Sequence, residues 1–451
     1  MELHPIYSIS PIDGRYNSYT QPLKIYFSEF ALFKYRLQFE VEYLIYLKTI
    51  GLPELKPFPS NNILLKNIYK NFSYDDCIQI KNIESNINHD VKAVEYFFSQ
   101  QLDKINLSKY KSFIHFGLTS QDINNNSITL SIKNCIEDIF IPLMENILND
   151  LLNKSSDWVQ YKMLSHTHGQ PAVPTTMGKE MMVFHYRISK QLQLLKNIDY
   201  YGKIGGASGN LNAHYAAYPD YHWEKLMEKF LLKFSLKRNN FTTQIDNYEN
   251  LSLIFDNLKR INTIFIDMNK DIWQYISMNY MIQTFEKNEV GSSTMPHKIN
   301  PINFENSEGN LLLANSLLNF MSEKLPISRL QRDLTDSTVL RSVGSIFGYM
   351  LIAYQNFKKG LSKLDINDYQ LKLDLNRNCV VIVEGIQTIL RKYGIDNGYE
   401  LCKDLSRNYN HISIDDIRHF INELDIDEKI KKELYKVDID NYIGNAENIF
   451  S

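Results

Sequence analysis

Residues 249–283 read ENLSLIFDNLKRINTIFIDMNKDIWQYISMNYMIQ and contain neither glycine nor proline. Apolar side chains recur in this stretch at alternating spacings of four and three residues, at Ile254, Leu258, Ile261, Phe265, Met268, Ile272 and Tyr275. This spacing places one apolar stripe along a helix and is typical of helices that cross at shallow angles in a bundle. The stretch therefore predicts one long helix packed against others, and it argues against a sheet in this region.

Four further stretches carry a similar but shorter periodicity, so we expect about five long helices in the middle of the chain. These stretches span residues 123–161, 179–200, 304–324 and 342–360. Pro142 falls inside the first of them, and a proline removes one helical hydrogen bond and crowds the preceding turn. We therefore expect a kink or a division at Pro142.

The chain has 451 residues, which exceeds the size at which a single hydrophobic core stops growing. Glycine and prolines in residues 51–59 separate helical stretches before the bundle, and Gly394 and Gly398 interrupt shorter periodic pieces after it. We predict an all-α fold of three helical domains, with the long-helix bundle in the second, at residues 1–110, 111–364 and 365–451.

The composition excludes several classes of protein. Apolar residues make up 44% of the chain and charged residues 22%, the balance of an ordinary globular protein. The net charge of -3 gives no broad positive surface for nucleic acid or for an anionic membrane. The N-terminus lacks the basic start and apolar stretch of a secretory signal, and no apolar run approaches the roughly 20 residues that span a bilayer.

The four cysteines, Cys77, Cys135, Cys379 and Cys402, lie far apart and form no C-x-x-C pair. This arrangement favours neither a disulfide framework nor a zinc site. We therefore expect a protein of the reducing cytoplasm.

The stretch GSSTMPHKINPINFEN, residues 291–306, gathers small, cationic and amide side chains ahead of a helix. Asn300 and Pro301 suit a helix start, because asparagine caps free amides and proline at the first helical position loses no bonded N–H. The positive end of that helix, with Lys298 beside it, would attract a carboxylate or a phosphate. An Asn-Pro pair alone is more often an ordinary capped turn with a surface lysine.

The segment SHTHGQPAVPTT, residues 165–176, places His166 and His168 two residues apart, ahead of a helix that begins near Gly178. A zinc site is one interpretation of this pair, but no third ligand lies nearby in the sequence. Two such histidines are more often one buried hydrogen-bonding group and one exposed group.

The segment FGLTSQDINN, residues 116–125, puts Thr119 and Ser120 at the start of another helix. Hydroxyl groups at such a position either cap the free amides or hold the anionic end of a ligand, and the two roles can coexist. From the residues alone, capping is the better interpretation.

Charged and polar residues also cluster at other expected element edges, in PIDGRY, NINHD, FTTQIDNYEN and RDLTDSTVLR. Taken singly, they are surface salt bridges, caps and polar entry residues, which say little about function. Gly205, Gly206 and Gly209 follow a predicted helix and not a strand, so they indicate backbone freedom and not a phosphate-binding fingerprint.

The stretch GSSTMPHKINPINFENSEGN, residues 291–310, resembles the signature loop of the fumarase/aspartase superfamily, whose common core is G-S-S-x-M-P-x-K-x-N-P. With His297 and the following NFENSEGN it is similar to the adenylosuccinate lyase family of that superfamily. The resemblance covers essentially the whole chain. It implies the all-α three-domain fold and a homotetramer whose sites each draw on three subunits. It also implies a reaction that needs neither metal nor cofactor.

The resemblance also implies which residues act. Ser292 corresponds to the general base, which acts as an alkoxide, and His168, in the T-H-G-Q motif, to the general acid; His166 stands where close relatives often carry arginine. The implied substrate-binding residues are Arg15, Tyr16, Asn88, His89, Asp90, Thr119, Ser120, Gln244, Ser293, Lys298, Ile299, Asn300, Asn306, Arg332, Ser337, Thr338, Val339, Leu340 and Arg341. Thr119 and Ser120 correspond to residues that hold the succinyl part of the substrate, and others to residues that contact the phosphate or the leaving base.

The implied reaction is the β-elimination of fumarate from adenylosuccinate, which gives AMP, and from SAICAR, which gives AICAR. Proton removal beside a carboxylate needs fixed donors for the developing charge, and Lys298, Asn300, Thr119 and Ser120 are the expected donors. Activation of Ser292 requires a lowered pKa and exclusion of water, so we expect the loop to be mobile until substrate closes it about Gly291.

Two alternatives remain at this point. The nearest is another lyase of the same superfamily, acting on argininosuccinate, fumarate or aspartate, but Arg15, His89, Arg332 and residues 337–341 would have no reason to coexist for a phosphate-free substrate. The second is a helical structural or interaction protein that has lost its activity, since fold does not fix function. Such a chain would tolerate losses at Ser292, His168 or Lys298, and all three residues are present.

Overall fold

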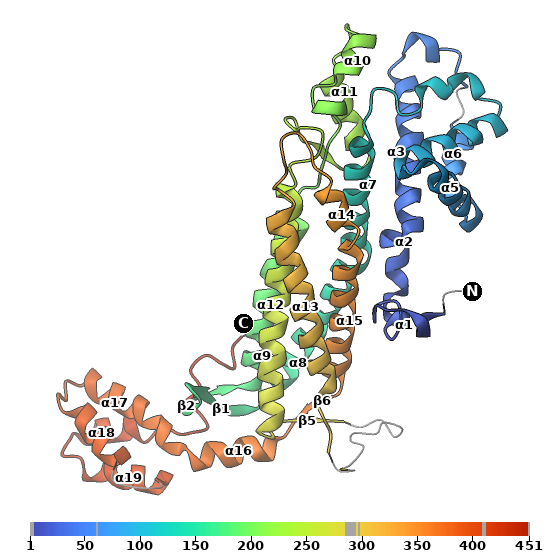
Figure 1. Cartoon of the computed structure of the whole chain (residues 1–451). Helices are drawn as coiled ribbons and strands as arrows, with labels where there is room; N and C mark the ends of the chain where they lie inside the picture. Colours follow the sequence, from blue (N-terminus) through green and yellow to red (C-terminus); the bar gives the residue numbers. More distant parts are fainter. Residues whose placement is uncertain (1–3, 60–61, 285–294, 296–297, 408–411, 450–451) are drawn as a thin grey trace. The chain divides into compact units, whose positions relative to one another are not determined.

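A computed structural model of the chain describes residues 4–59, 62–284, 295, 298–407 and 412–449 (Figure 1). Most of these residues are helical, and their strands are short and form three two-stranded sheets. The predicted all-α fold class is therefore confirmed. None of the helices within these ranges combines the length and the apolar character that crossing a bilayer requires.

The helices up to the middle of the chain are α1 (Asn17–Thr20), α2 (Lys24–Phe27), α3 (Glu29–Thr49), α4 (Ile63–Lys70), α5 (Tyr74–Ile87), α6 (Asp90–Lys104), α7 (Ser120–Cys135), α8 (Ile141–Trp158), α9 (Met177–Lys196), α10 (Asn212–Ala217) and α11 (Trp223–Leu232). The later ones are α12 (Glu249–Ser277), α13 (Ile302–Lys324), α14 (Thr335–Leu340), α15 (Val343–Ser362), α16 (Asp368–Arg377), α17 (Val383–Lys392), α18 (Gly398–Arg407), α19 (Ile414–Glu423) and α20 (Glu428–Leu434).

Each strand pairs with one other short strand. The antiparallel hairpin is β1 (Lys162–Thr167) with β2 (Gln170–Thr176). The parallel pair is β3 (Tyr201–Gly202) with β4 (Lys237–Arg238). The second antiparallel pair is β5 (Met281–Gln283) with β6 (Leu364–Ile366).

The chain divides into two compact units that interleave along the sequence. Unit 1 comprises residues 1–144, 191–263 and 309–355, and unit 2 comprises residues 145–190, 264–308 and 356–451. The long helices α9, α12, α13 and α15 contribute residues to both units. The three-domain division at residues 110 and 364 stays a prediction.

The long helix that the heptad pattern predicts is α12. Six of its seven stripe residues are buried, and the seventh, Tyr275, is half-buried. The helix ends at Ser277, because Asn279 adopts a left-handed conformation (φ 57°) and the amide of Tyr280 bonds back to the carbonyl of Tyr275 at 2.9 Å. Residues 281–283 then form β5, so the prediction that no sheet occurs here was wrong for these three residues.

The helix predicted over residues 123–161 is divided near Pro142, as expected. α7 ends at Cys135, a π-helical turn follows at Ile136–Phe140, and α8 begins at Ile141. Pro142 has no N–H to offer the carbonyl of Asp138, four residues earlier. The π turn accommodates this gap, because it bonds residues five apart, as the Ile141 amide does to the carbonyl of Ile136.

The other three predicted long helices are α9, α13 and α15. α9 starts at Met177, near the expected Gly178, and ends four residues before the expected limit of 200. α13 starts at Ile302, and the carbonyl of Pro301 accepts the amide of Glu305 at 3.2 Å. The helix therefore begins one residue after Pro301, whereas the prediction placed its first residue at Pro301.

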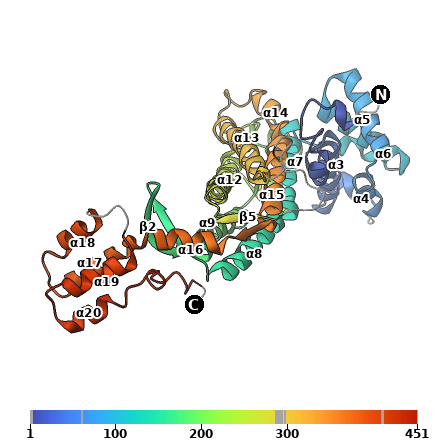
Figure 2. The ribbon, with the colours of Figure 1, turned by 90° about the horizontal axis from the view of Figure 1, so that it is seen from below.

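Each unit has its own packing. In unit 1, α3 packs against α4, α5, α6 and α7. Both views of the ribbon show α5, α6 and α7 beside it (Figures 1 and 2). In unit 2, α17, α18, α19 and α20 gather around a separate apolar cluster whose fully buried members include Ile382, Ile386, Leu390 and Leu434 (Figure 2). The four cysteines are buried, and none of them forms a disulfide within the described residues.

Candidate active site

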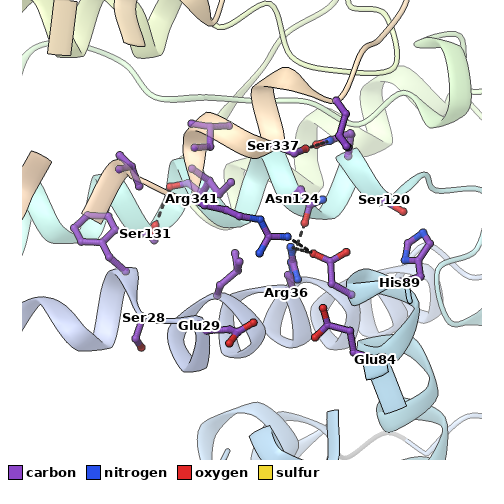
Figure 3. A pocket seen from close by; sticks show the side chains of 18 of the residues that line it. Ser28, Glu29, Arg36, Glu84, His89, Ser120, Asn124, Ser131, Ser337 and Arg341 are labelled. Atoms are coloured by element: carbon purple, nitrogen blue, oxygen red, sulfur yellow. Dashed lines mark hydrogen bonds and ion pairs between the residues drawn. The ribbon is translucent and has the colours of Figure 1, made fainter. Parts of the chain in front are cut away.

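Unit 1 contains a cavity of about 460 Å³ lined by side chains from α3, α6, α7 and the α14 region (Figure 3). Its wall brings together eight of the residues that the sequence assigned to substrate binding, namely Asn88, His89, Asp90, Ser120, Arg332, Ser337, Leu340 and Arg341. These residues come from three segments that lie far apart in the sequence. The fold therefore assembles in one cavity a set of side chains that sequence spacing alone could not connect.

Asp90 is the centre of charge pairing in this cavity. Its carboxylate lies 2.7 Å from Nη2 of Arg36 and 3.2 Å from Nη2 of Arg341 (Figure 3). Arg36 is buried and also donates from Nε to Asn124 at 2.8 Å, whereas Arg341 is exposed. Burial raises the pKa of Asp90, but the charge and hydrogen bond of Arg36 and the amide of Val91 outweigh it and hold this pKa below its usual value. Asp90 is therefore a carboxylate at neutral pH.

Two helices begin at the wall of the cavity. His89 caps α6, and its Nδ1 accepts a backbone amide of the first turn, so in the neutral ring Nε2 carries the proton and is a donor. α7 begins at Ser120 after its N-cap Thr119, as the sequence predicted. Free amides and the positive dipole end of a helix both favour a bound anion. With Arg332 and Arg341, the cavity offers several donors to a carboxylate or phosphate, although Glu29 and Glu84 also line it.

Several side-chain hydrogen bonds tie the segment of residues 332–341 to the rest of unit 1. Gln121 donates to Oγ of Ser337 at 3.0 Å, which joins α14 to the first turn of α7. Arg332 donates from Nη1 to Oε1 of Gln244 at 3.0 Å. Gln244 precedes α12 as predicted and does not line the cavity, so it reaches the site through Arg332.

Other predicted residues of unit 1 do not line this cavity. Thr119 is the cap behind Ser120, and Thr338 and Val339 lie on α14 beside lining residues. Arg15 lines a separate hollow near the N-terminus, and its guanidinium lies 5.9 Å from the ring centroid of Tyr16. Within unit 1, the structure therefore does not bring Arg15 and Tyr16 to the wall that carries Arg341.

His168 belongs to unit 2 and occupies the tip of the β1–β2 hairpin. Thr167 pairs with Gln170, so the turn consists of His168 and Gly169, with φ values of 55° and 71°. His168 is exposed at this tip. His166 lies within β1, 6.2 Å from Tyr280 between ring centroids.

The signature stretch is described only in part. Lys298 and Ile299 are exposed and Asn300 is half-buried, ahead of α13, which carries Asn306 in its first turns. Ser292, the predicted base, lies outside the described residues. The same holds for Gly291, Ser293 and His297 and for the expected closure of the loop.

The structure adds residues that the motifs did not single out. Arg36 pairs with Asp90, and the only sequence signal for it was a charged residue within the apolar stretch of α3. Glu40 lies on the same helix and accepts a hydrogen bond from the His115 ring at 2.6 Å. Lys203 is buried against Asp122 at 2.6 Å, and no spacing rule predicts such a pair.

The described residues contain no group of three or more His, Cys, Asp and Glu side chains placed to hold a metal ion. The arginines, helix starts and hydroxyl groups of the cavity can bind and polarise an anionic ligand.

Comparison with known proteins matches nearly the whole chain to lyases. Residues 14–314 match a family described as lyase, and residues 328–443 match the adenylosuccinate lyase C-terminal family. The adenylosuccinate lyase of Dictyostelium discoideum is 49% identical over 98% of this chain and 98% of its own. That of Escherichia coli K12 is 43% identical over 99% of this chain and 98% of its own.

Solved structures of low sequence identity share the fold. The 3-carboxy-cis,cis-muconate lactonizing enzyme of Pseudomonas putida superposes with a TM-score of 0.74 at 17% identity and covers 96% of each chain. A fumarate lyase from Mesorhizobium sp. BNC1 also gives a TM-score of 0.74, at 15% identity, over 95% of this chain and 96% of its own. The sequence matches and the shared helical fold together show that this chain belongs to the adenylosuccinate lyase family.

Proposed function

We propose that this protein eliminates fumarate from adenylosuccinate to give AMP, and from SAICAR to give AICAR. The observation that carries the proposal is the near full-length identity, 49% and 47%, to two relatives named adenylosuccinate lyase. The cavity of unit 1 is consistent with it, because it gathers arginines and two helix starts suited to an anionic nucleotide.

In this proposal Ser292 removes a proton from the carbon next to a carboxylate of the succinyl group. A serine hydroxyl is too weak an acid to do this unaided, so the closed loop has to lower its pKa through Lys298, helix-end amides and exclusion of water. Lys298, Asn300, Thr119 and Ser120 stabilise the charge that spreads into the carboxylate.

His168 delivers a proton to the departing nitrogen. An imidazole suits this step because its ordinary pKa allows both charge states near neutrality. Its exposed position at the tip of a two-residue turn supports the assignment, since the ring can enter a cleft formed with other parts of the assembly.

Arg332 and Arg341 recognise the phosphate or the base of the nucleotide, together with His89 and Ser337. Asp90 fixes the orientation of Arg341 through the 3.2 Å contact between them. Arg15 and Tyr16 approach the same ligand from another copy of the chain. This phosphate recognition favours adenylosuccinate over argininosuccinate, fumarate or aspartate as the substrate.

We infer a homotetramer with active sites shared between subunits, in the cytoplasm. Exposed apolar side chains support an assembly, because such groups usually mark contact surfaces when they gather on neighbouring helices. On the long helices they are Val183, Tyr186 and Leu194 of α9, Leu253 and Trp273 of α12, and Ile302, Leu312, Leu313 and Phe320 of α13.

The direct experiment mixes the purified full chain with adenylosuccinate and follows AMP and fumarate release by absorbance. The expected result is turnover on adenylosuccinate and on SAICAR, none on argininosuccinate, and no loss of rate after dialysis against a chelator. Absence of turnover on both nucleotides would support the alternative of an inactive interaction protein. Turnover on argininosuccinate alone would assign another lyase activity.

A further inference from the structure

One buried ion pair lies directly behind the start of α7. Nζ of Lys203 lies 2.6 Å from Oδ1 of Asp122, and neither side chain has any exposed surface. Taking two charges out of water costs several kcal/mol for each ion, and an apolar pair of similar size often stabilises a protein as well or better. Stability alone is therefore a weak reason for such a pair.

The carboxylate of Asp122 is fully occupied inside the protein. Besides Lys203, Oδ1 accepts the amide of Gly205 at 2.9 Å. Oδ2 accepts the amides of Thr119 and Gly206, each at 2.9 Å. A carboxylate has about four acceptor positions, and these four bonds use them. Asp122 therefore has no capacity left for a substrate and can act only through the groups that it holds.

These bonds join the start of α7 to the loop of residues 203–209. Gly206 has φ +69°, and a Cβ there would lie 3.1 Å from the carbonyl of Gly117. Lys203 is fixed independently, because its amide donates to Oδ1 of Asn126 at 2.9 Å and its Nζ donates to the carbonyl of Gly206 at 3.2 Å. The 203–209 loop thus packs closely on the segment that carries Thr119.

The far side of the same loop meets the segment that carries Gln244. A Cβ on Gly209 would lie 2.0 Å from the carbonyl oxygen of Thr242, so only a glycine allows this approach. Gln244 donates from Nε2 to the carbonyl of Ala207 at 3.0 Å and accepts from Arg332 at 3.0 Å. A continuous series of contacts therefore runs from the cap of α7 to the arginine in the cavity wall.

We propose that the buried Lys203–Asp122 pair is a positioning device for catalysis, which sets the 203–209 loop so that Thr119 and Ser120 stand in register with Gln244 and Arg332. The inference rests on the proposed function. In that function Thr119 and Ser120 hold the succinyl group, and Gln244 and Arg332 hold the nucleotide. A displacement of about 1 Å between groups that grip opposite ends of one substrate can cost about 10²-fold in rate.

The test is Lys203→Met, assayed on adenylosuccinate with wild type measured first. We expect kcat to fall about 100-fold and KM to change by less than about fivefold, because misplacement affects the transition state more than initial binding. Lys203→Arg, which keeps the charge, should recover part of the lost kcat. Lys133→Met is the matched control, since Lys133 lies on α7, as Asp122 does, and makes an equally short 2.6 Å ion pair with Glu137. Its kcat should stay within twofold of wild type.

Each outcome decides the question. A folded Lys203→Met protein with kcat within fivefold of wild type overturns the inference. A rise in KM with unchanged kcat would also overturn it, because it would place the pair in substrate binding only. Should neither Lys203→Met nor Lys203→Arg fold, as judged by circular dichroism and sedimentation, the pair serves stability and the inference is wrong. Wild type that releases no fumarate would refute the proposed function instead.

Discussion

The guanidinium of Arg36 lies 2.7 Å from the carboxylate of Asp90, with Arg36 buried and the Asp90 side chain 24% exposed. Asp90 therefore presents one oxygen to a fixed internal cation while the exposed Arg341 approaches the same oxygen from the cavity. The internal partner keeps Asp90 ionised, and Asp90 in turn limits where Arg341 can point. The geometry of a surface arginine is thus set by a buried one.

Replacing Asp90 with asparagine should destabilise the protein by about 1–3 kcal/mol at pH 7, because it leaves the Arg36 charge buried without a full partner. The pKa of Asp90 is lowered in the folded state, so its contribution is present above the ordinary value of 3.8 and is lost as pH falls through the folded pKa. Urea unfolding at pH 7 and below pH 4 measures this, and the difference between variant and wild type should shrink in acid.

The matched control for that experiment is Asp267→Asn. Asp267 pairs with Arg187 at 2.6 Å, but both side chains are substantially exposed. Surface pairs contribute little, so this change should cost less than about 1 kcal/mol. Equal losses for the two variants would contradict the importance of burial at Asp90.

His115 should make stability depend on pH in the alkaline range. Burial alone would lower its pKa, but Glu40 at 2.6 Å, Glu95 at 3.9 Å and the more distant Asp122 raise the pKa to about 9. A raised pKa means that the contribution is complete below the unfolded value of 6.5 and is lost as pH rises through 9. One pKa unit corresponds to about 1.4 kcal/mol, so the contribution amounts to a few kcal/mol.

Thermal or urea unfolding of wild type and of His115→Asn, between pH 6 and pH 10, checks this expectation. The two proteins should differ most at pH 6 and converge towards pH 10. A stability difference that stays constant across this range would show that the imidazolium charge is not its cause.

Ser292→Ala should reduce kcat by about 10³-fold or more and leave KM for adenylosuccinate within a few-fold, because a general base acts on the chemical step and not on binding. Steady-state kinetics with absorbance detection measure both constants. Ser316→Ala provides the comparison, since the Ser316 hydroxyl is exposed on α13 and bonds only to the Leu312 carbonyl among the bonds that the structure describes for it. Activity of Ser292→Ala near that of wild type would remove Ser292 from the mechanism.

Arg332→Ala should raise KM for adenylosuccinate about 30-fold, the effect of losing one charge-assisted hydrogen bond of about 2 kcal/mol. The same change frees Gln244, whose Oε1 then loses its 3.0 Å partner. Arg329→Ala is the control, because Arg329 is 80% exposed and the ion pair that the structure describes for it, with Asp333, is 3.5 Å long. A similar KM for both variants would place nucleotide recognition elsewhere.

Sequence reasoning predicted the long helices well, because one apolar stripe per helix is a local pattern. It missed the β1–β2 hairpin for a local reason too. β2 contains Pro171 and Pro174, and prolines argue against a strand. A two-stranded hairpin has open edges, however, where the missing N–H groups do no harm. The turn carries histidine where Asn-Gly is the usual signal.

The candidate site was predictable as a set of motifs and not as an arrangement. The chain segments around Asp90, Ser120 and Arg332 each showed caps or charges at an element edge, and the fold brought all three to one cavity. Arg36 and Lys203 could not be found in this way, because their partners are set by tertiary packing and not by spacing along the chain.

At the tip of the β1–β2 hairpin, stability and activity favour different side chains. A side chain other than glycine at φ 55° costs free energy, asparagine less than most, and the chain tolerates this cost at His168. His168→Asn should therefore unfold at the same temperature as wild type or slightly higher while turnover collapses, whereas His419→Asn, on the surface of α19, should change neither. An enzyme improved only for heat resistance would be expected to lose this histidine first.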